Sequence, residues 1–273
     1  NCGLYPSKNG VCLPPSSLDR TYTCTKILRE SMKNNMGRTI DNVKTVYIGV
    51  NEEEFELTKI VVEMAKGTGI KVIAGAGSND TETALKKVKF ANTAGVDGIL
   101  VVTPYYNKTS QKGLISHYNY VADRIDAPII LYNVPSRTGV NILPETYAKL
   151  SEHPNIVATK EANGDISSIA LTRSLCGDTL DIYSGNDDQI VPIMSLGGIG
   201  VISVLSNIAP KQTHKLCMDF LNGNCVSAGE QQVFYSQLIK ALFSDVNPIP
   251  VKEAMNMCGW NVGRCRMPLG QMN

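Results

Sequence analysis

The sequence has little of what marks nucleic-acid-binding or membrane proteins. Its 273 residues carry a formal net charge of +1, with no block of basic residues and no acidic tail. Nucleic acid and membrane surfaces are therefore poor candidate partners. No apolar run reaches the roughly 18 residues of a membrane-spanning helix. The N-terminus also lacks the charged-then-apolar order of a signal peptide, so we expect a cytoplasmic location.

The sequence also lacks the residue patterns of metal sites and disulfide frameworks. Its three histidines, His117, His153 and His214, share no metal-ligand spacing with one another or with the eight cysteines. No two cysteines form a Cys-x-x-Cys pair, and we interpret them as reduced thiols of a cytoplasmic protein. We expect neither a bound metal nor a catalyst based on histidine.

From about residue 50 onward, the chain alternates regularly between short apolar runs and helical stretches. The apolar runs predict strands, and about a dozen residues of helical pattern separate each run from the next. The predicted strands are 72–75, 98–103, 128–132, 156–160, 180–184 and 200–204. Repeated strand–helix units require crossover connections, and hence a parallel sheet.

This pattern predicts an α/β fold, specifically a (β/α)8 TIM barrel over residues 1–207. The remaining residues, 208–273, read as a C-terminal helical region with helices near 210–221, 226–243 and 250–258. Residues 1–48 fit less well, because no clean apolar strand precedes Val46 and several prolines interrupt the segment. A barrel needs two further strands there, so this segment conflicts locally with the predicted fold.

Lys160 is the sharpest candidate for a catalytic residue. Functional side chains of a barrel gather where the strands end, and Lys160 follows the apolar run Ile156–Thr159. A lysine at the end of a buried strand must be paired or have a lowered pKa. A lowered pKa is what a Schiff-base nucleophile requires. The alternative is a structural ion pair with Glu161 or with an aspartate.

Other polar residues follow neighbouring predicted strands. Tyr132 ends one strand and could relay protons, although packing is the more usual role of such a tyrosine. Tyr105 and Tyr106 are adjacent, so at most one faces a given site and the other could reach a neighbouring subunit. Arg137 lies in a loop rich in Pro and Gly, where its guanidinium would suit a substrate carboxylate or simply face solvent.

Six motifs around these residues resemble one known family. They are VTPYYN at 102–107, YNVPSRTG at 132–139, IVATKEA at 156–162, YSGND at 183–187, GVISV at 200–204 and NPIPVK at 247–252. Together they are similar to the 4-hydroxy-tetrahydrodipicolinate synthase (dihydrodipicolinate synthase) family of the N-acetylneuraminate lyase superfamily, over about residues 51–268. Arg137 and the 247–252 motif favour the synthases over sialic acid lyases and sugar-acid aldolases.

The resemblance implies a class I lyase that needs no cofactor. Pyruvate would form a Schiff base with the lysine, and the resulting enamine would attack L-aspartate 4-semialdehyde to give 4-hydroxy-tetrahydrodipicolinate. This is the first committed step of diaminopimelate and lysine biosynthesis. The family forms homodimers or homotetramers, so its partners are these two small molecules and copies of the same chain.

The resemblance also implies roles for five residues. Lys160 would be the Schiff-base lysine and Tyr132 the proton relay. The Tyr106 side chain would extend across a dimer interface into the active site of the partner subunit. Arg137 would bind the carboxylate of the semialdehyde, and the backbone carbonyl of Ile202 would lie close to the bound pyruvate.

One family motif does not match. The family has Gly-Thr-Thr-Gly-Glu after its second strand, where this chain has Asn-Val-Lys-Thr-Val at 42–46. Two alternatives to the synthase therefore stay open. One is another pyruvate-dependent class I aldolase with a different aldehyde substrate. The other is a non-catalytic homologue that lacks the threonine motif.

Overall fold

The computed structural model describes residues 51–272, with side chains from Glu53 onward. The anomalous segment 1–48, with the unmatched motif at 42–46, lies outside the described residues. The chain forms two compact units. One unit contains residues 55–202, and the other contains residues 203–272 together with residues 51–54 of the described part.

The first unit is built on a six-stranded sheet in which every neighbouring pair of strands is parallel. The strands lie in chain order: β1 (Ile73–Gly75), β2 (Gly98–Val102), β3 (Ile129–Asn133), β4 (Ile156–Glu161), β5 (Asp181–Ser184) and β6 (Gly200–Val201). The six strands predicted within 72–204 are therefore confirmed. The last is shorter than predicted, because Val204 already has helical backbone angles (φ −83°, ψ −41°).

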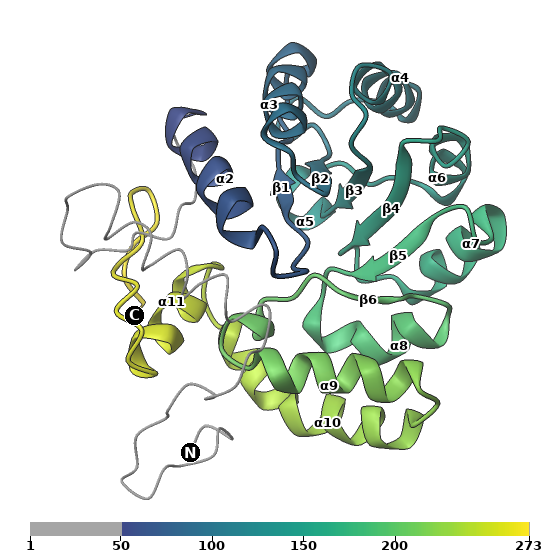
Figure 1. The fold of residues 1–273 in the computed structure, drawn as a ribbon. Coiled ribbons are helices and arrows are strands. Elements are labelled where there is room, and N and C mark those ends of the chain that lie inside the picture. Colours follow the sequence, from purple (N-terminus) through teal and green to yellow (C-terminus); the bar gives the residue numbers. More distant parts are fainter. Residues whose placement is uncertain (1–50, 273) are drawn as a thin grey trace, which may run out of the picture. The chain divides into compact units, whose positions relative to one another are not determined.

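Helices lie on the outer side of the curved sheet, among them α3 (Thr81–Ala94), α4 (Gln111–Ala122), α6 (Pro144–Leu150) and α7 (Ile166–Cys176) (Figure 1). The helix α2 (Asn51–Ala65) precedes β1, and the short helix α5 (Pro135–Thr138) follows β3. The 3-10 turn η1 (Asp187–Gln189) and α8 (Ile190–Ser195) connect β5 to β6. The helix ends follow local chemistry. The Asp80 side chain accepts the Thr83 N–H at 2.7 Å to begin α3, and Gly95, with φ 82°, ends it.

The core of this unit lies between the sheet and the helices. β3 is buried on both faces, as expected for a parallel strand covered on both sides. Fully buried side chains from strands and helices meet there, including Ile99, Leu114, Ile129, Leu131 and Leu150. The Tyr118 hydroxyl donates to the Val101 carbonyl at 3.2 Å, so the buried phenol is satisfied.

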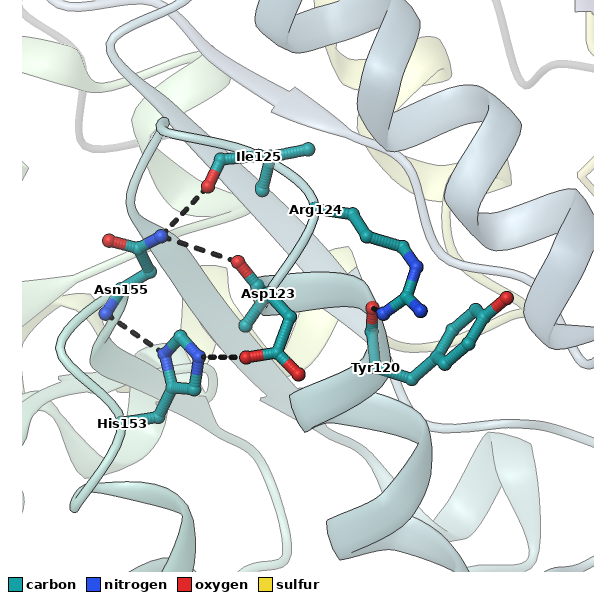
Figure 2. Close-up of polar contacts among 7 residues, drawn as sticks. Tyr120, Asp123, Arg124, Ile125, His153 and Asn155 are labelled. Carbon is teal, nitrogen blue, oxygen red and sulfur yellow. Dashed lines mark hydrogen bonds and ion pairs between the residues drawn. The ribbon is translucent and has the colours of Figure 1, made fainter.

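A polar cluster fixes the amino ends of β3 and β4 (Figure 2). The Asn155 side chain donates to the Ile125 carbonyl at 2.8 Å, and its backbone N–H donates to Nδ1 of His153 at 3.1 Å. Because Nδ1 accepts, the ring proton is on Nε2, which lies 3.1 Å from an Asp123 oxygen. We call Asp123, His153 and Asn155 the amino-end cluster.

The second unit holds the C-terminal helices. After the 3-10 turn η2 (Leu205–Asn207) come α9 (Pro210–Leu221), α10 (Cys225–Leu242) and α11 (Ile249–Met257), close to the predicted bounds. They enclose their own core, which includes Leu205, Ile239, Met255 and Trp260. No helix among residues 51–272 is both long and apolar enough to cross a membrane.

Candidate active site

Lys160 and Tyr132 meet at the carboxyl ends of β3 and β4. The parallel register places Lys160 beside Tyr132 on one side and beside Tyr183 of β5 on the other. Residues in register point to the same face of a sheet. The Lys160 Nζ accordingly lies 4.4 Å from the centroid of the Tyr132 ring. The structure thus brings together two residues that the sequence singled out separately.

Lys160 points to the inner face of the curved sheet. Its chain neighbours Thr159 and Glu161 both contact the hydroxyl of Tyr147, which belongs to the outer helix α6. Successive side chains of a strand alternate between faces, so Lys160 points away from α6. The amine is therefore presented on the side of the sheet that a barrel encloses.

The surroundings of Lys160 favour its neutral form. Burial is the main cause that lowers its pKa, to about 8, because desolvation disfavours the ammonium. The negative charge of Asp187 opposes this shift, while the positive charge of Arg137 adds to it. Asp187 opens η1 after β5 and is almost fully buried. A neutral amine fraction near pH 7 is what a Schiff-base nucleophile needs.

Glu161 is not the ionic partner of Lys160, because its carboxylate is used on the opposite face. It accepts the Tyr147 hydroxyl at 2.6 Å, the Asn163 backbone N–H at 2.8 Å and the Asn133 side-chain amide at 3.0 and 3.1 Å. Burial raises the pKa of Glu161 to about 7, and these hydrogen bonds lower it. We call Asn133, Tyr147 and Glu161 the carboxyl-end cluster.

Arg137 lies on the loop between β3 and α6. The loop contains the short helix α5, with Pro135 at its first turn and Gly139 in the left-handed region (φ 72°) at its end. The positive φ favours glycine at this position, whereas the nearest neighbour of an added Cβ atom is the flexible end of the Lys108 side chain, which can move away. Arg137 itself is exposed, and its charge acts on Lys160.

Tyr106 projects away from the protein. It is 90% exposed, against 40% for Tyr105. The Asn107 N–H donates to the Tyr105 carbonyl at 2.9 Å, and Tyr106 between them has φ 72°. This is a tight turn that a residue with a large side chain rarely adopts. Strained backbone of this kind is typical of functional positions.

The structure places the remaining predicted site residue, Ile202, directly after β6. Its N–H donates to the Ser184 carbonyl at 2.9 Å, which extends the ladder between β5 and β6 by one bond. The predicted role of its carbonyl toward pyruvate remains a prediction, as do the roles of the other site residues.

The two histidines of this unit serve structural contacts. His117 Nδ1 lies 2.9 Å from the Thr81 hydroxyl, and burial lowers the pKa of His117. It lines a pocket of about 450 Å³ between α3 and α4, together with Asn79 and Asn107. His153 belongs to the amino-end cluster. Among residues 51–272, no group of three or more metal-ligating side chains is placed to hold an ion.

The sequence did not indicate the roles of four residues in and around the site. It suggested no function for Asn133 or Tyr147, and Glu161 was predicted only as a possible ionic partner of Lys160. Asp187 stood in a matching motif but was not assigned to the surroundings of the amine. Motif position could have suggested Asp187, because it follows the end of a neighbouring strand. Nothing in the sequence singles out Tyr147.

Known proteins match the chain over the whole described part. The model of the Dihydrodipicolinate synthetase family matches residues 48–273. The 4-hydroxy-tetrahydrodipicolinate synthase of Caldicellulosiruptor saccharolyticus is 57% identical over 222 residues, which cover 81% of this chain and 75% of that protein. That of Clostridium novyi is 52% identical over 221 residues, covering 81% of this chain and 74% of that protein.

Solved structures agree with this match. Dihydrodipicolinate synthase from Thermotoga maritima superimposes with a TM-score of 0.82 at 41% identity, covering 98% of this chain and 90% of that one. The chloride-inhibited enzyme from Acinetobacter baumannii, solved in complex with pyruvate, gives a TM-score of 0.82 at 33% identity, covering 96% and 90%. The predicted resemblance and the α/β barrel fold are both confirmed.

Proposed function

The chain belongs to the dihydrodipicolinate synthetase family, and we propose that it condenses pyruvate with L-aspartate 4-semialdehyde through a Schiff base on Lys160. The product is 4-hydroxy-tetrahydrodipicolinate, in the first committed step of diaminopimelate and lysine biosynthesis. The observation that carries the mechanism is the Lys160 amine, which lies 4.4 Å from the Tyr132 ring with a pKa lowered by burial to about 8.

The first half of the reaction forms the Schiff base. The neutral Lys160 amine attacks the ketone carbon of pyruvate and gives a carbinolamine. Tyr132 passes a proton to the carbinolamine hydroxyl, which leaves as water, and the iminium forms. With a pKa about one unit above neutral pH, roughly a tenth of the amine is ready to react at pH 7.

The second half forms the new carbon–carbon bond. The iminium withdraws electrons, so the pyruvyl methyl group loses a proton and becomes an enamine carbon. That carbon bonds to the aldehyde carbon of the semialdehyde, whose oxygen takes a proton and becomes the hydroxyl. The amino group of the condensed chain then attacks the iminium carbon, closes the ring and releases the Lys160 amine. No cofactor is required, because the iminium itself accepts the electrons.

The other site residues bind and complete the site in this proposal. Arg137 binds the carboxylate of the semialdehyde, to which its planar guanidinium is suited. The Ile202 carbonyl lies beside the pyruvyl group. Tyr106 enters the site of a second copy of the chain in a homodimer or homotetramer, which its 90% exposure supports. The free thiols of Cys176 and Cys225 suit the cytoplasm as the place of reaction.

A substrate panel tests the choice of aldehyde. The protein is assayed with pyruvate and either aspartate semialdehyde or aldehydes that lack its carboxylate or its amino group. The proposal expects kcat/KM for aspartate semialdehyde to exceed the others by at least about a hundredfold, and Arg137→Leu to remove most of that preference. Equal or better turnover of another aldehyde would indicate a different pyruvate-dependent aldolase. Turnover of none would favour a non-catalytic homologue.

A further inference from the structure

Glu161 is a buried acidic residue that no step of the proposed reaction uses. It directly follows the Schiff-base lysine on β4, but it is 2% exposed and its side chain points to the opposite face of the sheet. Isolated buried carboxylates are costly, so such a group is retained only where hydrogen bonds compensate for the lost hydration. Its hydrogen bonds therefore indicate what it holds in place.

Every described hydrogen-bond partner of Glu161 is a donor. The Tyr147 hydroxyl and the Asn163 N–H each bind one oxygen, and the Asn133 amide is shared between the two. Tyr147 in turn accepts the Thr159 hydroxyl at 3.2 Å. The carboxyl group thus joins α6, the end of β3 and the residues that follow β4.

Asn133 extends this connection to the Arg137 loop. The Asn133 amide nitrogen that meets Glu161 also donates to the Asn141 side-chain oxygen at 2.7 Å. The Asn133 side-chain oxygen accepts the Ile142 N–H at 3.1 Å. Asn133 begins the loop and Asn141 and Ile142 end it, so one side chain closes the loop at both ends. The loop between these ends carries Arg137.

Glu161 orients the Asn133 amide. An amide side chain can rotate to exchange its nitrogen and oxygen, which would reverse its bonds to Asn141 and Ile142. When Glu161 is ionised, both of its oxygens are acceptors, so only the orientation with the amide nitrogen toward Glu161 avoids placing two acceptors against each other. That orientation is the one that presents oxygen to Ile142 N–H and nitrogen to Asn141. The loop closure therefore depends on the acceptor at position 161.

From this geometry we propose that Glu161 is a positioning residue that, through Asn133, fixes the Arg137 loop relative to Lys160 and so governs capture of the second substrate. The inference rests on the proposed function, in which Arg137 binds the carboxylate of the semialdehyde. Schiff-base formation with pyruvate uses the Lys160 amine and Tyr132 on the other face, and it does not require the loop.

The test compares Glu161→Met with two matched variants. Glu161→Met keeps the length of the side chain and removes both acceptors. Glu161→Gln keeps one acceptor for Asn133 while its nitrogen can donate to the Tyr147 oxygen. Tyr147→Phe removes a different hydrogen bond of the same carboxyl-end cluster and leaves Asn133 in place. For each variant, KM is measured for both substrates, and the pyruvyl adduct on Lys160 is trapped with borohydride.

The expected result is a split between the substrates. Glu161→Met raises KM for aspartate semialdehyde about tenfold or more, because a misplacement of about 1 Å in a positioning group can cost about a hundredfold. Its KM for pyruvate and its adduct yield stay within about threefold of the original protein. In Glu161→Gln, KM for aspartate semialdehyde lies within about threefold of that of the original protein. In Tyr147→Phe it also lies within about threefold, although this variant is less stable to heat.

A double variant separates positioning from general damage. If Glu161 acts through the Arg137 loop, adding Arg137→Leu to Glu161→Met lowers kcat/KM much less than Arg137→Leu lowers it alone. Additive losses, or an unchanged aldehyde KM in Glu161→Met, would overturn the inference. If Glu161→Met does not fold, Asn133→Ala cuts the same link from the other side and must show the same split. Failure of the unaltered protein to form the adduct would instead contradict the proposed function.

Discussion

Two polar clusters lie at opposite ends of the same pair of strands, and they differ in burial. The amino-end cluster is partly open to solvent, with the Asp123 side chain 61% exposed. In the carboxyl-end cluster, Asn133 and Tyr147 are fully buried and Glu161 is 2% exposed. Both connect neighbouring strands through side-chain hydrogen bonds. Only the carboxyl-end cluster carries the desolvation cost of a buried carboxyl group.

This difference follows the division of labour in a barrel. Loops at the amino ends of the strands mainly stabilise the fold, whereas those at the carboxyl ends form the active site. At the amino end, the pair of half-buried His153 with Asp123, whose side chain is 61% exposed, contributes on the order of 1 kcal/mol. At the carboxyl end, losing one partner of a buried hydrogen bond costs about 1–3 kcal/mol. The buried polar groups of the carboxyl-end cluster therefore indicate that this cluster holds the active-site loops in place.

The largest expected effect comes from removing the nucleophile. Lys160→Ala should lower kcat by more than about a thousandfold, because no other group can form the Schiff base. The control is Lys252, a buried lysine whose amine donates to the Arg264 carbonyl at 2.8 Å. Lys252→Met should lower the free energy of unfolding by about 1–3 kcal/mol and keep the adduct on Lys160. Comparable turnover in both variants would contradict these assignments.

The next effect separates the two tyrosines beside Lys160. Tyr132→Phe should lower kcat by about a hundredfold or more, because the proton relay is lost while the ring remains. Tyr183 flanks Lys160 on the other strand, and Tyr183→Phe should keep kcat within about threefold. Steady-state kinetics with both substrates distinguishes the two. A larger loss of kcat in Tyr183→Phe than in Tyr132→Phe would indicate that Tyr183 of β5 is the proton relay.

The carboxyl-end cluster should also make stability depend on pH. Burial raises the pKa of Glu161 from its ordinary 4.5 to about 7 in the folded protein. The folded state therefore binds the proton more tightly than the unfolded state, so this stabilising contribution is complete below pH 4.5 and lost as pH rises through 7. Relative to Glu161→Gln, the original protein should lose stability between pH 5 and pH 8 in urea unfolding. A constant difference between the two would show that Glu161 does not titrate there.

The smallest effect belongs to the amino-end cluster. His153→Gln should lower the free energy of unfolding by about 1 kcal/mol, because the Asp123 carboxylate that loses its partner is 61% exposed and can be hydrated instead. kcat and both KM values should stay unchanged, since the contacts lie at the end of the strands opposite Lys160. Thermal unfolding and steady-state kinetics of this variant check both statements. A clear change in KM would show that the two ends of β4 are coupled.

The sequence predicted much of this architecture. Apolar runs separated by helical stretches located all six described strands, because a parallel strand buried on both faces is a continuous apolar run. Lys160 and Tyr132 could be recognised because each ends such a run. Their contact could be expected only after the strands were paired, since it depends on the register of β3 and β4.

The carboxyl-end cluster could not be predicted in the same way. Glu161 follows Lys160, and alternation along a strand predicts that the two side chains point to opposite faces. The alternation does not identify which donors bind the Glu161 carboxyl group. Tyr147 comes from α6 and Asn141 from the end of a loop, so their contacts depend on how the helix and loop pack against β4. Such contacts between distant segments carry no local sequence signal. The shorter β6 reflects the same limit, because the turn into η2 overrides an apolar run.

The most direct test of the account is to incubate the protein with pyruvate and borohydride and to locate the adduct by mass spectrometry. We expect one reduced pyruvyl group per chain, on Lys160, and faster labelling as pH rises toward the lysine pKa of about 8. That result would establish that the half-buried Lys160 amine at the end of β4 is a working nucleophile. A folded protein that forms no adduct, or forms it on another lysine, would contradict the central claim.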